Sequence, residues 1–196
     1  MEFSEVVRRR RMVRNYTDEP VSEDAIDRIA AAALRGPSAG YSQGVRLIVV
    51  TDEATRRRIA ELADEPAYIA NGLGPWISIA PVHLVVCVRA DDYHERYNEP
   101  DKRRPGDPEM DWPVPYWWVD AGAALMLALL ATVDEGLAAG LVGFHSVPEL
   151  KTALGIPDDV SPIGVVTIGH PAPDRRSGSL ARGPKPRAET VRREHW

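Results

Sequence analysis

The sequence is poor in cysteine. Cys87 is the only one among 196 residues, so an internal disulfide is excluded and the common zinc motifs are absent. This cysteine lies in the apolar run PVHLVVCVRA, where we expect it to be a small core residue. The sequence therefore predicts no metal site.

Several motifs of nucleotide-binding proteins and hydrolases are also missing. The chain has no Gly-rich dinucleotide loop, no Walker phosphate loop, and no serine or cysteine nucleophile in a recognisable setting. These absences argue against a Rossmann dehydrogenase, a P-loop NTPase and a hydrolase with a nucleophilic side chain.

No long hydrophobic run indicates a signal peptide or a membrane span. The N-terminus carries charges where a signal peptide needs an apolar stretch. The apolar run at 121–133 is shorter than a bilayer requires, and Asp120 and Asp134 flank it. We therefore expect a cytoplasmic protein that does not bind a membrane.

An overall positive charge is absent too. The formal net charge is -5, with 44% hydrophobic and 27% charged residues, as in ordinary globular enzymes or binding proteins. A nucleic-acid-binding protein of this size would more often be basic throughout, so no nucleic-acid partner is expected. The arginines at 8–11 and Arg14 are thus a local feature. They could form a solvated basic face, or Arg10 and Arg14 could share one helix face and hold an anion at two points.

Four short apolar runs, at 45–50, 81–88, 137–144 and 162–171, predict buried strands. Helical patterns cover 2–11, 52–64 and 116–136, and two further helices are expected to begin at the N-caps Ser22 and Ser146. Together these elements predict a three-layer arrangement of helices and sheet. Periodicity alone does not tell whether the strands are parallel or antiparallel.

The chain divides into a domain at 1–171 and an extension at 172–196 that lacks a core pattern. We expect this extension to run over a surface, such as that of a second subunit. The segment at 90–118 is polar, proline-rich and aromatic, and it is either a functional covering loop or a flexible insertion.

Two connections carry candidate binding groups. In GPSAGYSQG, at 36–44, the glycines let the backbone approach a flat ligand, and Ser38 and Gln43 could bond the polar edge of a heterocycle. The segment could equally be a plain helix-to-strand loop. In AAGLVGFHSVPEL, at 138–150, amides near Gly143 could bind an oxygen atom, or form an ordinary turn. His145 is either a proton donor or a structural residue.

In their order and spacing, these segments resemble the nitroreductase superfamily of FMN-dependent oxidoreductases. The resemblance covers nearly the whole chain, and the matching motifs are RRMVR at 10–14, GPSAGYSQGV, the DAG that begins at Asp120, GLVGF, ELKTALGIPDD, VVTIGHPAP and PKPRAETVRREHW. It implies an α+β fold with a central, mostly antiparallel sheet flanked by helices. It also implies a homodimer with two FMN sites between the subunits and a C-terminal tail wrapped around the partner.

The resemblance assigns Arg10 to the FMN phosphate and Arg14 to the N1–O2 edge of the ring, where positive charge favours hydride acceptance. The cofactor-binding residues that it implies are Arg10, Arg11, Met12, Arg14, Pro37, Ser38, Ala39, Gln43, Val142, Gly143, Arg182 and Lys185. Met12 stands where many relatives have serine, Tyr41 replaces an asparagine, and Gly44-Val45 replaces Pro-Trp.

The resemblance further implies that NAD(P)H reduces FMN and that a conjugated acceptor, such as a nitroaromatic or a quinone, is then reduced in a ping-pong reaction. The acceptor would contact Tyr41 and an aromatic wall made by Tyr93, Tyr97, Trp112, Tyr116, Trp117 and Trp118. Trp117 and Trp118 could instead pack in a dimer core. Three alternatives stay open: a flavin-cleaving relative, a reductive dehalogenase, and a flavin-binding protein without turnover.

Overall fold

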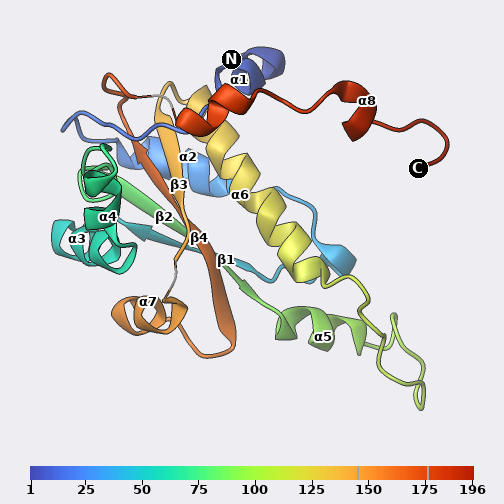
Figure 1. Ribbon diagram of the computed structural model, residues 1–196. Helices are drawn as coiled ribbons and strands as arrows, with labels where there is room; N and C mark the ends of the chain where they lie inside the picture. Colours follow the sequence, from blue (N-terminus) through green and yellow to red (C-terminus); the bar gives the residue numbers. More distant parts are fainter. Residues whose placement is uncertain (145, 176) are drawn as a thin grey trace.

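The computed structural model describes residues 1–144, 146–175 and 177–196. Within these residues, four strands form one sheet with helices on both faces (Figure 1). The three-layer arrangement expected from the sequence is therefore present. His145, the candidate proton donor, lies outside the described residues.

The strands are β1 (Val45–Val50), β2 (Val82–Arg89), β3 (Ala138–Val142) and β4 (Val160–Gly169). They lie in the order β1-β2-β4-β3, and every neighbouring pair is antiparallel. This confirms the antiparallel sheet that the resemblance implied, and leaves β1 and β3 as the outer strands.

The central strand β2 alternates between two cores. Val85 and Cys87 face α3 (Glu53–Leu62), α4 (Glu65–Ala70) and α7 (Val147–Leu154), whereas Leu84 and Val86 face α2 (Glu23–Ala33) and α6 (Tyr116–Asp134). Because both faces are covered, the strand reads as an unbroken apolar run. Burial raises the pKa of the Cys87 thiol to about 11, which agrees with an inert core residue.

The helix signals of the sequence were mostly correct. The Ser22 hydroxyl accepts a hydrogen bond from the Ala25 amide at 3.3 Å and caps α2 as predicted. Helix α7 forms where expected, but the Ser146 side chain makes no capping hydrogen bond with the described residues. Helix α1 (Phe3–Arg9) ends before Arg10, so the prediction that Arg10 and Arg14 share a helix face is wrong.

The reason for this early end is a contact with the sheet. Met12 forms an isolated parallel bridge with Ala139 of β3, and the Val13 amide donates to the Ala139 carbonyl at 2.9 Å. Pairing with an outer strand requires extended backbone, and this long-range contact outweighs the local helical pattern.

The predicted covering loop contains a helix, α5 (Asp91–Tyr97), and its last residues open α6. The connection between α5 and α6, residues 98–115, contains no regular helix or strand. In Figure 1, α5 and this connection extend beyond one end of the sheet, beside the N-terminal end of α6.

Helix α6 is 19 residues long, and its length and mean hydropathy of 1.5 would allow it to cross a bilayer. The helix is longer than the apolar run at 121–133, because it also includes residues 116–120 and Asp134. A helix that packs in a core has the same composition, and one side of α6 lies on the sheet and α2. Its other side exposes Trp118, Val119 and Met126.

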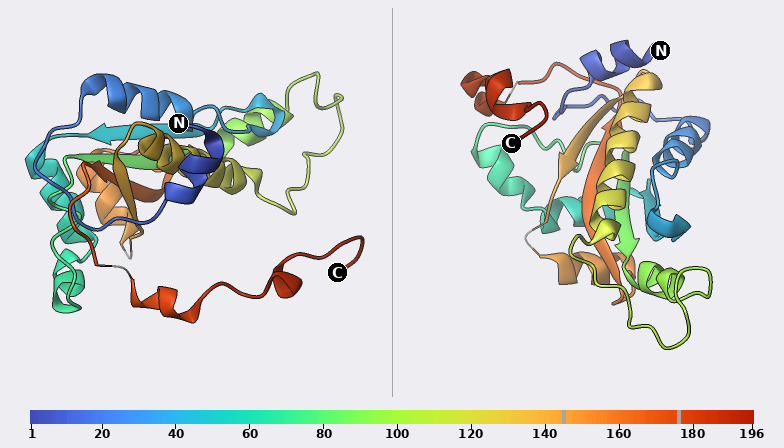
Figure 2. Two further views of the ribbon diagram at one scale, coloured as in Figure 1. Left: turned by 90° about the horizontal axis from the view of Figure 1, so that it is seen from above. Right: turned by 90° about the vertical axis from the view of Figure 1, so that its right-hand side faces the viewer.

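The C-terminal segment leaves the body of the protein. It is fixed at its start, where Pro171 bridges to Tyr16 and the Ala172 amide donates to the Asn15 carbonyl at 3.2 Å. Beyond Ser177 the residues are exposed, including the short helices η2 (Gly178–Arg182) and α8 (Arg187–Thr190). Figure 2 shows this segment running outward, separate from the layers.

Candidate functional site

The arginine run separates into members with different environments. Arg8 pairs with Glu5 of α1 at 2.7 Å, and Arg9 pairs with the same carboxylate. Hydrogen bonds from these two arginines lower the pKa of Glu5 to about 2. Arg8 and Arg9 therefore form the solvated basic face that the sequence left as one possibility.

Arg11 and Arg14 meet a buried carboxylate from the other end of the chain. Asp174 accepts from the Arg11 guanidinium at 3.1 Å and from the Arg14 backbone amide at 3.0 Å, and its side chain is only 3% exposed. Among the described residues, no acidic side chain pairs with the guanidinium of Arg10 or Arg14. Asp174 thus fixes the backbone of Arg14 and leaves its charge available.

The Arg14 guanidinium lies over the Trp76 ring, 5.6 Å from its centroid, and Trp76 is 1% exposed. The turn that carries Trp76 is held by the buried Glu65 carboxylate, which accepts from the amides of Ile77 at 2.6 Å and Ser78 at 2.9 Å. The contact with Trp76 and the hydrogen bonds that hold its turn thus fix the position of the Arg14 side chain. A cleft of about 300 Å³ opens beside it, lined by Arg14, Tyr68, Asn71, Leu73, Arg175 and Ser177.

The end of β3 belongs to the same edge of the molecule. The bridge from Met12 to Ala139 lays the arginine segment along this strand, whose last residue, Val142, is buried and precedes Gly143. The approach is close, because a Cβ on Gly140 would lie 2.6 Å from the Val13 carbonyl oxygen. Glycine at 140 is therefore required for the arginine segment to lie here.

A second group of candidate residues lies in the connection at 36–44, which contains the short helix η1 (Ala39–Tyr41). The Ser38 hydroxyl accepts from the Gln43 amide at 2.7 Å and closes the loop, while Tyr41 is 74% exposed. The cleft on this side measures about 610 Å³, and its lining includes Pro37, Ser38, Tyr41, Gln43, Arg46 and Asp92.

Tyr93 does not lie where an acceptor could contact it, contrary to the aromatic wall expected from the sequence. It is 0% exposed, burial raises its pKa, and its hydroxyl donates to the Asp120 carboxylate at 2.8 Å. Tyr97 and Trp117 are half-buried and pack on Trp112, with ring centroids 4.8 and 5.6 Å from it. Contacts among these aromatic side chains stabilise the segment at 90–118.

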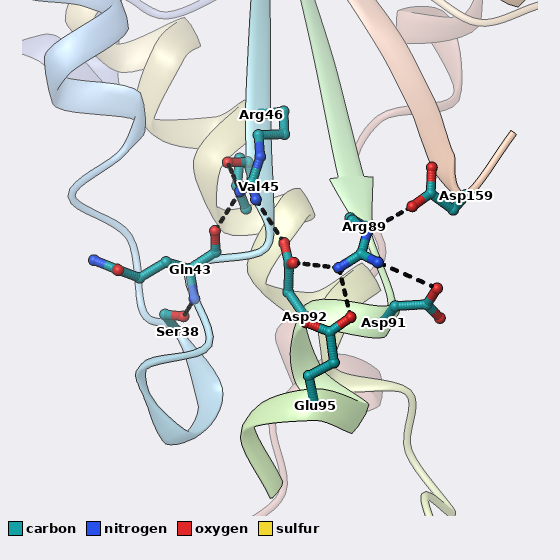
Figure 3. A network of polar contacts seen from close by, with 9 residues as sticks. All are labelled: Ser38, Gln43, Val45, Arg46, Arg89, Asp91, Asp92, Glu95 and Asp159. Atoms are coloured by element: carbon teal, nitrogen blue, oxygen red, sulfur yellow. Dashed lines mark hydrogen bonds and ion pairs between the residues drawn. The ribbon is translucent and has the colours of Figure 1, made fainter. Parts of the chain in front are cut away.

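Ion pairs anchor α5 to the sheet next to the loop (Figure 3). Arg46 of β1 donates to the Gln43 carbonyl at 2.5 Å and to Asp92 at 2.8 Å. Arg89 at the end of β2 binds Asp92 at 2.7 Å, and it also binds Asp159, next to β4, at 2.6 Å. The position of the loop is thus coupled to α5.

The arginine segment and the 36–44 loop lie at opposite ends of α6. The Ala39 amide binds Asp120 near the start of α6, whereas the N-terminus pairs with Asp134 at the end of α6, where Arg11 and Val133 line one small cleft. Fourteen residues of helix separate Asp120 from Asp134, which is about 21 Å at 1.5 Å per residue. One chain therefore does not bring the arginine segment and the 36–44 loop together (Figure 1).

The tail residues Arg182 and Lys185 line neither of these two clefts. Sequence reasoning missed Trp76, Asn71 and Asp174, which surround Arg14. No local motif marks them, because each reaches Arg14 from a distant part of the chain. Within the described residues, no group of three or more His, Cys, Asp or Glu could hold a metal ion.

A family model described as the Nitroreductase family matches residues 7–170 of the chain. The chain belongs to the nitroreductase family. This agrees with the antiparallel sheet flanked by helices.

Individual members of the nitroreductase family are similar over most of this chain. The FMN reductase [NAD(P)H] of Bacillus subtilis is 34% identical over 171 residues, which are 83% of this chain and 63% of that protein. The chain thus spans less than two thirds of the length of this relative.

Solved structures show the same fold. The hypothetical oxidoreductase YcnD from Bacillus subtilis superimposes with a TM-score of 0.77 at 29% identity, over 100% of this chain and 75% of that one. The NADPH:FMN oxidoreductase from Vibrio harveyi, complexed with NAD+, gives a TM-score of 0.75 at 23% identity, over 99% of this chain and 77% of that one.

Proposed function

We propose that this nitroreductase-family chain is an FMN-dependent oxidoreductase. It oxidises NAD(P)H and reduces a conjugated acceptor, such as a nitroaromatic or a quinone, in two separate half-reactions. The names of the Bacillus FMN reductase and the Vibrio NADPH:FMN oxidoreductase support the cofactor and the donor. The observation that carries the proposal is the Arg14 guanidinium, which lies on Trp76 beside a cleft and pairs with no described acid.

The donors around Arg14 fit FMN. A guanidinium, the Asn71 amide and the Ser177 hydroxyl line one cleft, and such donors match the oxygens of a phosphate or of a pyrimidine edge. In the other cleft, the Gln43 backbone amide fixes the Ser38 hydroxyl, and this hydroxyl and the exposed side-chain amide of Gln43 would contact the ring. When bound, FMN would supply the hydride-accepting ring that this chain lacks.

The residues of the chain would bind and orient this group. Arg14 would hold positive charge where negative charge develops on reduction, and Arg10 would bind the phosphate. The amides near Val142 and Gly143 would face the ring edge. Met12 offers no hydroxyl where many relatives have serine, so any contact from this position would come from its backbone.

We propose that the complete site needs two copies of the chain. The contacts of the two groups with α6, at Asp120 and Asp134, are about 21 Å apart along the helix, so the arginine segment of one copy would meet the Ser38 loop of another. Exposed apolar side chains on two neighbouring helices favour such a dimer, because a second copy would cover them. They are Phe3 and Val7 of α1 and Tyr116, Trp118, Val119 and Met126 of α6. The exposed tail would then carry Arg182 and Lys185 to the second copy.

The acceptor would contact the exposed Tyr41 ring at the mouth of the larger cleft. Tyr97 and Trp117 would contribute from the neighbouring aromatic cluster, whereas Tyr93 is too deeply buried to touch a ligand. Stacking needs no side-chain acid or base, which suits the absence of a catalytic constellation among the described residues.

The test is a visible spectrum of the purified protein, followed by anaerobic addition of NADPH or NADH. A flavin band that bleaches on addition is the expected result. A colourless protein that does not take up FMN would contradict the cofactor. Bound flavin that stays oxidised would favour a flavin-binding protein without turnover, and loss of free flavin would favour cleavage.

A further inference from the structure

We propose that Asp120 and Tyr93 form a positioning pair that sets the conformation of the loop at 36–44 and thereby the affinity and orientation of FMN. This inference rests on the proposed function, because the loop matters for binding only if FMN is the ligand. Neither residue touches the cofactor in this scheme. Both act through the backbone of Ala39.

The loop has a conformation that its own sequence does not favour. Tyr41 has a φ of 60° and Gln43 a φ of 55°, and both are non-glycine residues in the left-handed region. Such residues cost free energy and persist where surrounding contacts hold them. The candidate ring contacts, Ser38 and Gln43, lie within this stretch.

Asp120 supplies one of these contacts. Its side chain is buried at the start of α6, and a single carboxylate oxygen, Oδ2, accepts from both the Ala39 amide and the Tyr93 hydroxyl at 2.8 Å. A buried carboxylate is stable only when donors satisfy it, so the two bonds are interdependent. Ala39 directly follows Ser38, which places the bond at the base of the candidate site.

Helix α5 supplies the matching surface. A Cβ on Gly44 would lie 2.4 Å from the Tyr93 ring, and one on Gly40 would lie 2.5 Å from the Tyr97 ring. Arg96 of the same helix also donates to the Gly40 carbonyl at 2.9 Å. The loop thus packs closely on α5, and the Asp120 carboxylate of α6 joins the Tyr93 hydroxyl of α5 to the Ala39 amide of the loop.

A second connection keeps the loop attached when this point is lost. Arg46 still links the Gln43 carbonyl to Asp92 (Figure 3). Removing the Tyr93 hydroxyl should therefore loosen the arrangement of Ser38 and Gln43 without detaching the loop. The consequence is a change in ligand binding that exceeds the change in stability.

The experiment compares Tyr93→Phe with Thr132→Val. Tyr93→Phe removes the hydroxyl and keeps the ring against Gly44. Thr132→Val removes a different buried hydroxyl, which donates to the Ala128 carbonyl at 2.8 Å. Thr132 lies on α6, 12 residues beyond Asp120. Tyr93→Phe should lose the more thermal stability of the two, because its hydroxyl bonds a buried carboxylate, whereas the Thr132 hydroxyl bonds a neutral carbonyl.

FMN binding separates the two variants. We expect Tyr93→Phe to raise the Kd for FMN roughly 5- to 20-fold, less than the roughly 10- to 150-fold expected when a direct bond to a charged group is lost, because the Tyr93 hydroxyl acts on the ligand only through the loop. The visible circular dichroism of the bound flavin should also change, because the ring contacts shift. Thr132→Val should keep the wild-type Kd within about twofold and leave the flavin spectrum unchanged. Equal Kd values and spectra in both variants would overturn the positioning role.

The wild-type titration distinguishes this failure from failure of the proposed function. If the wild type does not bind FMN, the proposed function itself is wrong, and the role of the pair with it. If Tyr93→Phe does not fold, Asp120→Asn carries the test, since the amide keeps the shape but replaces the charged acceptor with a neutral one and so weakens both bonds. A wild-type Kd and flavin spectrum in Asp120→Asn would then overturn the proposal.

Discussion

Replacing Arg14 with glutamine should weaken FMN binding far more than it weakens the fold. In the structure, the Arg14 backbone amide binds Asp174, and this bond survives the substitution. The side chain contributes its contact with Trp76 at 5.6 Å, which is worth about 0.5–1 kcal/mol at a partly exposed site. The free energy of unfolding should therefore fall by no more than about 1 kcal/mol.

Binding should respond more strongly. A hydrogen bond to a charged group contributes roughly 1.5–3 kcal/mol, so loss of the Arg14 guanidinium should raise the Kd for FMN about 10- to 150-fold. The Kd is measured by quenching of FMN fluorescence at fixed ionic strength, and the free energy of unfolding by urea denaturation. Both are needed, because a variant that binds weakly after partial unfolding would give the same binding result.

Arg8→Gln is the matched control within the same arginine run. Arg8 is exposed and pairs with Glu5 on α1, so its loss should change neither the Kd nor the stability to a measurable extent. Wild-type FMN affinity in Arg14→Gln would refute the reasoning, as would equal weakening in both variants, which would indicate only a general attraction between a basic surface and an anion.

Two further measurements test the core and the assembly. His83 of β2 is 0% exposed, and burial lowers its pKa to about 4. The stability that depends on its neutral form is therefore fully present above about pH 6.5, and roughly 3 kcal/mol of it is lost as the pH falls towards 4. Urea unfolding of wild type and His83→Gln between pH 4 and 7 checks this, and parallel pH profiles would exclude the effect. Trp118→Glu, on the exposed side of α6, should give folded monomers in sedimentation velocity that bind FMN weakly. Unaltered FMN binding by a monomer would contradict a site shared between two copies.

The sequence alone determined the features that depend on neighbouring residues. The apolar runs predicted all four strands, because a strand covered on both faces needs apolar side chains at successive positions. Ser22 predicted the start of α2, since its hydroxyl bonds an amide only three residues away. The ordered motifs indicated the family, and the family implied the antiparallel sheet.

The tertiary structure decided what depends on contacts between distant residues. Arg10 and Arg14 do not share a helix because Met12 pairs with β3, and Arg14 is fixed by Asp174, which lies 160 residues away along the chain. Tyr93 looked like a ligand contact in a polar loop, but it is buried and bonded to Asp120. Local patterns do not encode such pairings, since each depends on which surfaces the packed layers bring together.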